Sequence, residues 1–173
     1  MSKKKILLIT YDNCDDSEVL YPLFRMREAG YTVDVASMEK RTIKAKYHFT
    51  VDVTLLLDEV DPSEYAGLIL PGGTAPEKIR QQAAALEITK YFDRNHLPIA
   101  AICHGPLILI SAGTLRGRRC TCYPGIRDDL INAGGLYENA EVVVDGALVT
   151  SRRPEDLPAF MREFVALLGK NDN

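Results

Sequence analysis

Short apolar runs alternate along the chain with longer segments whose apolar residues recur at helical spacing. The continuous aliphatic and β-branched runs predict strands buried on both faces of a sheet. These strands are expected at residues 3–10, 31–37, 64–70 and 97–103. Helices are expected at residues 15–30, 75–96 (in two pieces), 104–113, 125–135 and 155–169.

Three further segments are predicted to be short or irregular. Residues 49–60 are expected to form a strand pair away from the main sheet, and residues 118–123 a short strand. Residues 140–151 are expected to form a hairpin that turns at Asp145-Gly146. The alternation as a whole predicts an α/β fold, a doubly wound sandwich around a mostly parallel central sheet. Since the chain shows no linker or repeat, we expect a single domain over residues 1–173.

Composition and charge narrow the classes of partner. The formal net charge is −3, so nothing favours binding to nucleic acid or to an anionic membrane. No apolar stretch reaches the roughly 18 residues that a membrane span needs. The first apolar run, "ILLIT", is too short for a secretory signal. These features predict a cytoplasmic protein.

The ends of the predicted strands gather the polar residues that could carry chemistry. In an open parallel sheet, binding sites form at the carboxyl ends of the strands. The first strand runs into residues 11–18, the third into Gly72-Gly73 and the fourth into Cys103-His104. If these strands are neighbours in the sheet, their exits meet in one cleft.

The stretch "PIAAICHGPLILISAG" places Cys103 on a sharp turn from strand to helix, a nucleophile elbow. Gly105 leaves room for the turn, and Pro106 begins the helix where its missing N–H costs nothing. The free N–H groups at the helix start are expected to lower the pKa of the thiol. The alternative is that Cys103 is an unreactive core cysteine.

His104 is the first candidate for the base that pairs with Cys103. Consecutive residues do not face each other on a helix, so the two side chains converge only if the turn is distorted. The other histidines are His48 and His96. No histidine follows His104, which excludes a base far downstream, as in class I glutamine amidotransferases.

Glu18 is the acid that we favour beside the thiol. A carboxyl group buried there would tend to stay protonated and could act as acid and base. The alternative is a solvated glutamate that complements the helix dipole. Asp15, one turn away, is a weaker candidate. Backbone N–H groups at Gly72 and Gly73, with that of His104, could form an oxyanion hole.

The remaining cysteines show no spacing typical of a zinc site, and we expect neither a metal nor an organic cofactor. Cys120 and Cys122 are interpreted as packing residues. Cys14 precedes Glu18 in a loop; it is expected to be exposed and could form a disulfide with Cys103 if the two lie close together.

Five stretches together resemble the ThiJ/PfpI family over essentially the full length, and most closely its PfpI-type intracellular peptidase branch. They are "EVLYPLFRMREAG", "LILPGGTAPEKIR", "AICHGPLILISAGTLRGR", "YPGIRDDLINAG" and "EVVVDGALVTSRRPEDLPAFMREF". The resemblance implies a flavodoxin-like sandwich. It also implies a homo-oligomer, a dimer or a hexamer, whose active sites lie at subunit interfaces.

The resemblance further implies roles for individual residues. Cys103 matches the nucleophile, His104 its partner, and Glu18 the protonated glutamate beside the thiol. Glu77, in "TAPEKIR", matches a third triad member that reaches the site from a neighbouring subunit. Tyr123 matches a tyrosine that lines the same cleft. Relatives in the peptidase branch carry Glu where Asp15 stands, which argues against an acid role for Asp15, and Cys14, Cys120 and Cys122 are not part of the family's pattern.

Three functions follow as hypotheses. The first is a stress-related cysteine hydrolase of the PfpI type, in which Cys103 attacks a peptide amide and His104, held by Glu77, protonates the leaving amine. The second is a glyoxalase III or protein deglycase, in which Cys103 adds to methylglyoxal or to an adduct and Glu18 moves a proton before water releases lactate. The third is a non-enzymatic redox sensor or chaperone. A small polar cleft would favour the aldehyde reaction, and a long groove would favour peptides.

Overall fold

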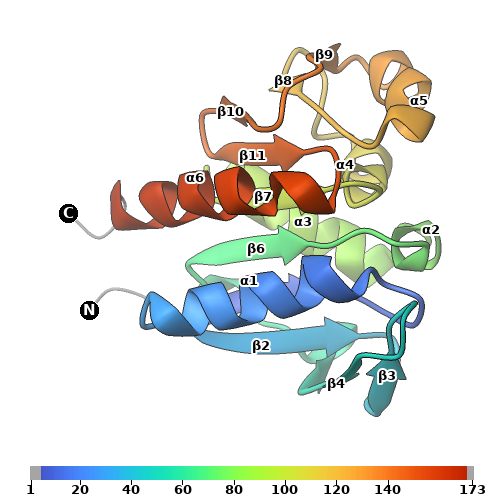
Figure 1. Cartoon of the computed structure of the whole chain (residues 1–173), viewed down its shortest axis with the longest axis vertical. Helices are drawn as coiled ribbons and strands as arrows, with labels where there is room; N and C mark the ends of the chain where they lie inside the picture. Colours follow the sequence, from blue (N-terminus) through green and yellow to red (C-terminus); the bar gives the residue numbers. More distant parts are fainter. Residues whose placement is uncertain (1–4, 171–173) are drawn as a thin grey trace.

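The computed structural model describes residues 5–170. The strands of its main sheet are β1 (Lys5–Ile9), β2 (Thr32–Ser37), β5 (Leu55–Leu56), β6 (Gly67–Leu70), β7 (Ile99–Ile102), β10 (Val143–Asp145) and β11 (Leu148–Ser151). They lie in the order β10-β11-β7-β6-β1-β2-β5 (Figure 1). Each neighbouring pair is parallel except β10 with β11. The predicted α/β fold with a mostly parallel central sheet is confirmed.

Helices cover both faces of this sheet. Figure 1 shows α1 (Asp16–Glu28) and α6 (Leu157–Lys170) in front of it and α3 (Ala83–Arg94) behind it. Two shorter helices, α2 (Ala75–Ile79) and α4 (Pro106–Ala112), lie near the carboxyl ends of the strands, and α5 (Arg127–Asn132) lies beyond α4. The central strands β1, β6 and β7 are almost wholly buried because both faces are covered.

The ends of the helices follow from local residue chemistry. Asp15 caps α1 by accepting hydrogen bonds from the N–H groups of Ser17 and Glu18. Gly113, with φ +73°, ends α4 in the left-handed conformation that favours glycine, and Pro106 is the first residue of α4. The predicted helix at 75–96 divides into α2 and α3, as expected. The first two residues of the predicted strand 3–10 lie outside the described residues.

Two details of the prediction are wrong. Residues 49–60 do not pair with one another: β4 (Thr50–Asp52) pairs with the earlier strand β3 (Thr42–Lys44), and β5 joins the edge of the main sheet. The loop of the β10–β11 hairpin is Gly146-Ala147, because Asp145 is still paired with Leu148. The short strand in 118–123 is present as β8 (Arg119–Cys120), which pairs with β9 (Leu136–Tyr137).

The strand order determines where a site can form. Strand β1 lies between β2 and β6, so the direction of winding reverses between β1 and β6. Ligand sites in open α/β sheets lie outside the carboxyl ends of the strands at such a switch point. The exits of β1, β6 and β7 are neighbours there, as the sequence predicts. Within residues 5–170, no helix has the length and apolarity required to span a bilayer.

Candidate active site

Cys103 follows β7 directly and has a φ of +61°, which is unusual for a residue other than glycine. Its N–H donates to Ser151 O over 3.1 Å, and its carbonyl accepts the N–H of Tyr123 over 3.0 Å. These two bonds hold the backbone in a conformation that costs about 1–3 kcal/mol. A strained cysteine between a strand and a helix is the predicted nucleophile elbow.

Two glycines let other segments approach this turn. A Cβ atom on Gly105 would collide with the carbonyl group of Leu70 at the end of β6. A Cβ atom on Gly72 would lie 2.7 Å from Cys103 Cβ and 2.6 Å from Glu18 Oε2. The close packing of the three strand exits therefore depends on the absence of side chains at these positions.

The side chains of Cys103 and His104 converge although the residues are consecutive. Cys103 Sγ lies 3.2 Å from His104 Nδ1. The sequence predicts that the two side chains meet only if the turn is distorted, and the positive φ of Cys103 provides that distortion. The His104 ring stacks on Tyr123, with ring centroids 4.8 Å apart and planes inclined by 25°. Tyr123 therefore lines the same cleft and orients the imidazole.

Glu18 lies in the third position of α1 and is fully buried. Its Oε2 accepts the N–H of Gly72 over 2.7 Å, and its Oε1 has no hydrogen-bond partner among the described residues. Burial, followed by the charge of Asp15, raises the pKa of Glu18 to about 8, while the Gly72 N–H and the Cys103 thiol oppose the rise. The carboxyl group is therefore mostly protonated at neutral pH.

The prediction of a lowered thiol pKa is wrong for this chain. Burial, and next the charge of Glu18, raise the pKa of Cys103 above its ordinary value. The N–H groups of Gly73 and His104 act on the sulfur in the opposite direction but are outweighed. The helix-start argument considered only those N–H groups and left out the loss of water around the sulfur.

His104 and Glu77 interact through space. Burial lowers the pKa of His104, and the negative charge of Glu77 opposes this change. Glu77 is exposed on α2. The described chain contains no hydrogen bond between the two side chains, but the isolated chain already places the Glu77 charge within electrostatic reach of the imidazole.

Asp15 lines the cleft as predicted but also caps α1, and Gly72 has another role than the predicted one. Asp15 Oδ1 accepts hydrogen bonds from Ser17 N, Ser17 Oγ and Glu18 N, so this carboxylate serves as the cap of α1. The N–H of Gly72 is taken by Glu18 and is not free for an oxyanion. The N–H groups of Gly73 and His104 both face the sulfur and remain the candidates for that role.

A pocket of about 450 Å³ opens above the cysteine. It is lined by residues from the exits of several strands: Asn13, Asp15, Glu18, Lys46, Gly73, Thr74, Cys103, His104, Tyr123, Arg153 and Pro154. Sequence reasoning missed Asn13, Lys46, Thr74, Arg153 and Pro154. Arg153 and Pro154 could have been found, because they follow the carboxyl end of β11, but no signal in the sequence points to Lys46.

The other cysteines are not among the residues that line this pocket. Cys14 is fully buried rather than exposed, and burial raises its pKa to about 11. Cys120 and Cys122 are also fully buried, as expected of packing residues. Throughout residues 5–170, no three His, Cys, Asp or Glu side chains gather in a way that could hold a metal ion.

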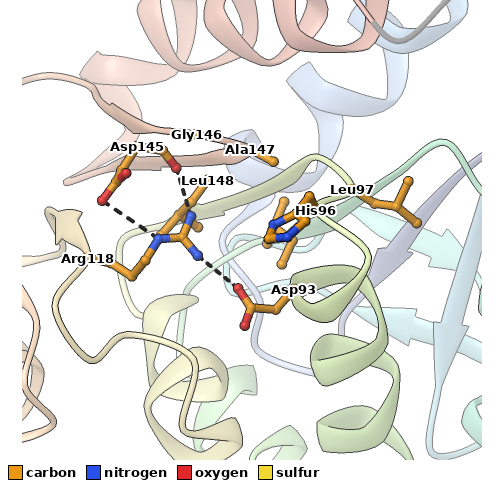
Figure 2. Close-up of a pocket in the computed structure, with 9 residues that line it drawn as sticks. Asp93, His96, Leu97, Arg118, Asp145, Gly146, Ala147 and Leu148 are labelled. Carbon is orange, nitrogen blue, oxygen red and sulfur yellow. Dashed lines mark hydrogen bonds and ion pairs between the residues drawn. The ribbon is translucent and has the colours of Figure 1, made fainter.

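A second pocket, of about 280 Å³, lies at the amino ends of β7 and β11. Figure 2 shows Arg118 between Asp93 and Asp145, with His96 beside them. Arg118 donates to Asp93 Oδ1 over 2.8 Å and to Asp145 O over 2.7 Å. This second pocket has no cysteine in its lining, and it lies at the opposite end of the sheet from Cys103.

Comparisons with known proteins place the chain in one family. A model described as the DJ-1/PfpI family matches residues 4–167. The chain is 51% identical to deglycase PfpI of Pyrococcus furiosus, over 95% of this chain and 99% of that protein. It is 44% identical to protein/nucleic acid deglycase 2 of Escherichia coli, over 98% of this chain and 99% of that protein.

The fold agrees with these sequence matches. The crystal structure of a ThiJ/PfpI domain protein from Brachyspira murdochii superimposes with a TM-score of 0.94 at 24% identity, covering 98% of this chain and 99% of that one. The family resemblance read from the five sequence stretches is thereby confirmed. The chain belongs to the DJ-1/PfpI family.

Proposed function

We propose that this chain hydrolyses adducts between 2-oxoaldehydes such as methylglyoxal and amines or thiols, releasing the amine or thiol and a 2-hydroxy acid. The observation that carries the proposal is the contact of 3.2 Å between Cys103 Sγ and His104 Nδ1 beside the protonated Glu18. The pocket has a volume of about 450 Å³, which is enough for a small carbonyl substrate. The relatives named deglycases support the same reaction class.

The first step uses the cysteine and the histidine. His104 is mostly neutral because burial lowers its pKa, so Nδ1 is able to take the thiol proton as the sulfur attacks. Cys103 replaces the amine or thiol on the aldehyde carbon, and the displaced group leaves with the proton that His104 received. The product of this step is a hemithioacetal on Cys103. Gly73 and His104 N–H groups face the region where negative charge develops.

The second step moves a proton within the hemithioacetal. A general base works best with a pKa near the operating pH, and the pKa of Glu18 is about 8. The ionised fraction of Glu18 takes the proton from the former aldehyde carbon and returns it to the neighbouring carbon. The first carbon is oxidised to a thioester while the second is reduced to an alcohol, so no external oxidant is needed. Water then cleaves the thioester, giving the 2-hydroxy acid and the free thiol.

Peptide hydrolysis is a second candidate, favoured by the electrostatic contact between Glu77 and His104. In this reaction Cys103 attacks an amide carbonyl and His104 protonates the leaving amine. Glu77 of a neighbouring subunit would orient the imidazole in a homo-oligomer, either a dimer or a hexamer, whose active sites lie at the interface. The exposed position of Glu77 on α2 is compatible with such a contact.

The physiological setting belongs to the same proposal. Repair of aldehyde adducts is a defence against metabolic stress. The four cysteines are unpaired, which fits a reducing compartment such as the cytoplasm.

Purified wild type and Cys103→Ser, each assayed on a methylglyoxal–thiol adduct and on a denatured protein, test the two candidates. We expect release of lactate from the adduct by the wild type and a loss of about a thousandfold or more in Cys103→Ser. Cys120→Ser is the matched control, because it replaces another buried cysteine that does not line the pocket. Equal lactate release by wild type and Cys103→Ser would overturn the proposal.

Glu77→Gln distinguishes the peptidase from the deglycase. If the peptidase reaction operates, this variant loses peptide cleavage and the protein migrates as an oligomer in sedimentation analysis. Peptide cleavage that survives in Cys103→Ser would come from a contaminating protease and would remove the peptidase candidate.

A further inference from the structure

Two cations line the candidate active site, and the reaction proposed above uses neither of them. Lys46 lies in the connection between β3 and β4, and Arg153 lies directly after the loop residue that follows β11. Both line the pocket that contains Cys103. The two residues are far apart in the sequence, so only the fold brings them to one cavity.

Hydrogen bonds fix the backbone on which Lys46 stands. Its N–H donates to Cys14 O over 2.9 Å, in the loop that leads to Glu18. The next turn of the same connection is tied to α1, since the N–H groups of Tyr47 and Phe49 each donate to the Asp16 carboxylate over 2.7 Å. These bonds therefore fix the point on the backbone from which the Lys46 side chain extends.

Arg153 is anchored through its neighbours in the same way. Ser151 accepts the N–H of Cys103, so the strand that leads to Arg153 is bonded to the nucleophile itself. Arg152 is held by Asp156, with its Nε 2.9 Å from Oδ2. The segment that carries Arg153 is thus built against the cysteine turn.

Both cations have weak partners in the free chain. Within residues 5–170, no carboxylate oxygen lies within 4 Å of Lys46 Nζ; the group stands 5.0 Å from the ring centroid of Tyr47. The tyrosine, and more weakly the charges of Asp15 and Cys103, raise the pKa of Lys46. The pair between Arg153 and Glu155 is 3.9 Å long and largely exposed, so it contributes little.

The carboxyl groups that line the pocket offset only one of these two charges. Asp15 contributes one negative charge, although its Oδ1 also accepts three hydrogen bonds at the N-terminus of α1. Glu18 is mostly neutral at pH 7 because its pKa is about 8. Glu77 is not among the lining residues and acts on His104. The pocket therefore carries a net positive charge beside a nucleophile.

We propose that Lys46 and Arg153 bind an anionic group of the substrate, a carboxylate or a phosphate on the amine or thiol portion that Cys103 displaces from the former aldehyde carbon. The preferred adducts are then those of anionic amines and thiols, such as amino acids or nucleotides, rather than neutral ones. This inference rests on the proposed function for its catalytic consequence, but the anion site itself stands on the placement of the two cations.

Alkylation of Cys103 tests the anion site without any turnover. Iodoacetate and iodoacetamide alkylate the same sulfur and differ chiefly in charge. The rates are measured at Cys103 by mass spectrometry on the intact protein, with N-acetylcysteamine as the free-thiol reference. We expect the ratio of the iodoacetate rate to the iodoacetamide rate to exceed that of the reference by about tenfold at low salt and to fall with added salt.

Substitutions assign the effect to the two residues. Lys46→Met and Arg153→Met are each expected to lower the rate ratio by about three- to fivefold, and the double variant is expected to return it to the reference value. Lys90→Met is the matched control, since Lys90 pairs with Glu87 on α3 and does not line the pocket. A ratio equal to that of the reference thiol, a ratio unchanged in the double variant, or failure of both reagents to label Cys103 overturns the anion site.

A substrate comparison separates this inference from the proposed function. Methylglyoxal adducts of N-acetylcysteamine, N-acetylcysteine and 2-mercaptoethyl phosphate present no anion, a carboxylate and a phosphate. We expect kcat/KM to be about tenfold higher for one or both anionic adducts than for the neutral adduct, and the double variant to give the same kcat/KM for all three adducts. Equal turnover of all three adducts contradicts the anion site alone. Absence of turnover with a charge-dependent alkylation ratio contradicts the proposed function alone.

Discussion

The two ends of the central sheet each carry a pocket with a histidine, but the charged groups of the two pockets differ in how they are paired. At the amino end, Arg118 bonds to Asp93, to the carbonyl of Asp145 and, over 3.7 Å, to the Asp145 carboxylate (Figure 2). Every charged group drawn there has a partner of opposite charge. Such a cluster ties α3 to the β10–β11 hairpin and needs no ligand to satisfy it.

At the carboxyl end, the described residues form no salt bridge with Glu18, Cys103 or His104, and Arg153 has only an exposed pair with Glu155 over 3.9 Å. Glu18 is buried with one oxygen unbonded, and burial shifts the pKa values of Glu18, Cys103 and His104 away from their ordinary ranges. Displaced pKa values that cluster in a pocket mark functional sites more often than structural ones. The comparison shows that the pairing of charges, and not the presence of a histidine or a cavity, separates a structural cluster from a reactive one.

The sharpest test of this difference replaces one histidine in each pocket by the same residue. His104→Asn is expected to lower kcat/KM by about a hundredfold or more, because the group that accepts the thiol proton is lost. His96→Asn is expected to leave kcat/KM unchanged, since asparagine tolerates the φ of +53° at this position. Steady-state kinetics on a methylglyoxal adduct measure kcat/KM for both variants. Similar losses in the two variants would contradict the distinction between a reactive and a structural pocket.

Glu18→Gln carries the next largest effect. The amide keeps an oxygen to accept the Gly72 N–H but has no proton to shuttle, so kcat is expected to fall about a hundredfold. The folded pKa of about 8 lies above the ordinary 4.5, so the native state binds the extra proton between these values and loses stability as the pH rises through them.

The stability of Glu18→Gln relative to the wild type therefore changes with pH. The variant should gain about 1–3 kcal/mol in free energy of unfolding between pH 5 and pH 8, because glutamine has no charge to bury. Urea unfolding at several pH values measures this difference. A difference that stays constant across the range would mean that Glu18 is ionised in the native protein at neutral pH.

Arg118→Met probes the paired cluster. Loss of its hydrogen bonds leaves Asp93 and Asp145 without their cation, so the free energy of unfolding is expected to fall by about 1–2 kcal/mol with no change in kcat/KM. The control is Arg127→Met, whose pair with Asp128 is exposed and should contribute under about 0.5 kcal/mol. A large drop in kcat/KM at constant stability would show that the amino-end pocket takes part in the reaction.

The smallest expected effect comes from Asp15→Asn. Asparagine also caps helices well, so stability should hardly change. Removal of the negative charge should lower the pKa of Glu18, since that charge is the second cause of its rise. The pH at which kcat changes with the ionisation of Glu18 would then fall by a fraction of a unit. An unchanged pH profile would show that burial alone sets the pKa of Glu18.

The sequence carries the fold and the position of the site because both depend on patterns that repeat over many residues. Aliphatic runs between amphipathic segments predict the parallel order, and the carboxyl ends of β1, β6 and β7 then meet. Elements of only two residues are too short to show such a pattern. Strand β5 is therefore not predicted in the main sheet, and the hairpin loop differs from its prediction by one residue.

The electrostatics of the site could be predicted only in part. Protonation of Glu18 follows from the expectation of a buried carboxyl group. The raised thiol pKa does not follow from the sequence, because the depth of Cys103 depends on how Gly72 packs against it. The contact with His104 depends on a backbone angle that spacing alone does not specify. Lys46 reaches the pocket from the β3–β4 hairpin, and no sequence motif predicts where this hairpin lies relative to the pocket.

Titration of Glu18 in the native protein tests the central claim most directly. With ¹³C placed in the glutamate carboxyl groups, the resonance absent from Glu18→Gln identifies this residue. We predict that its chemical shift changes with a midpoint near pH 8, because the carboxyl group is buried beside Cys103. A midpoint near the ordinary value of 4.5 would contradict the account, since Glu18 would then be an ionised and solvated helix-start residue.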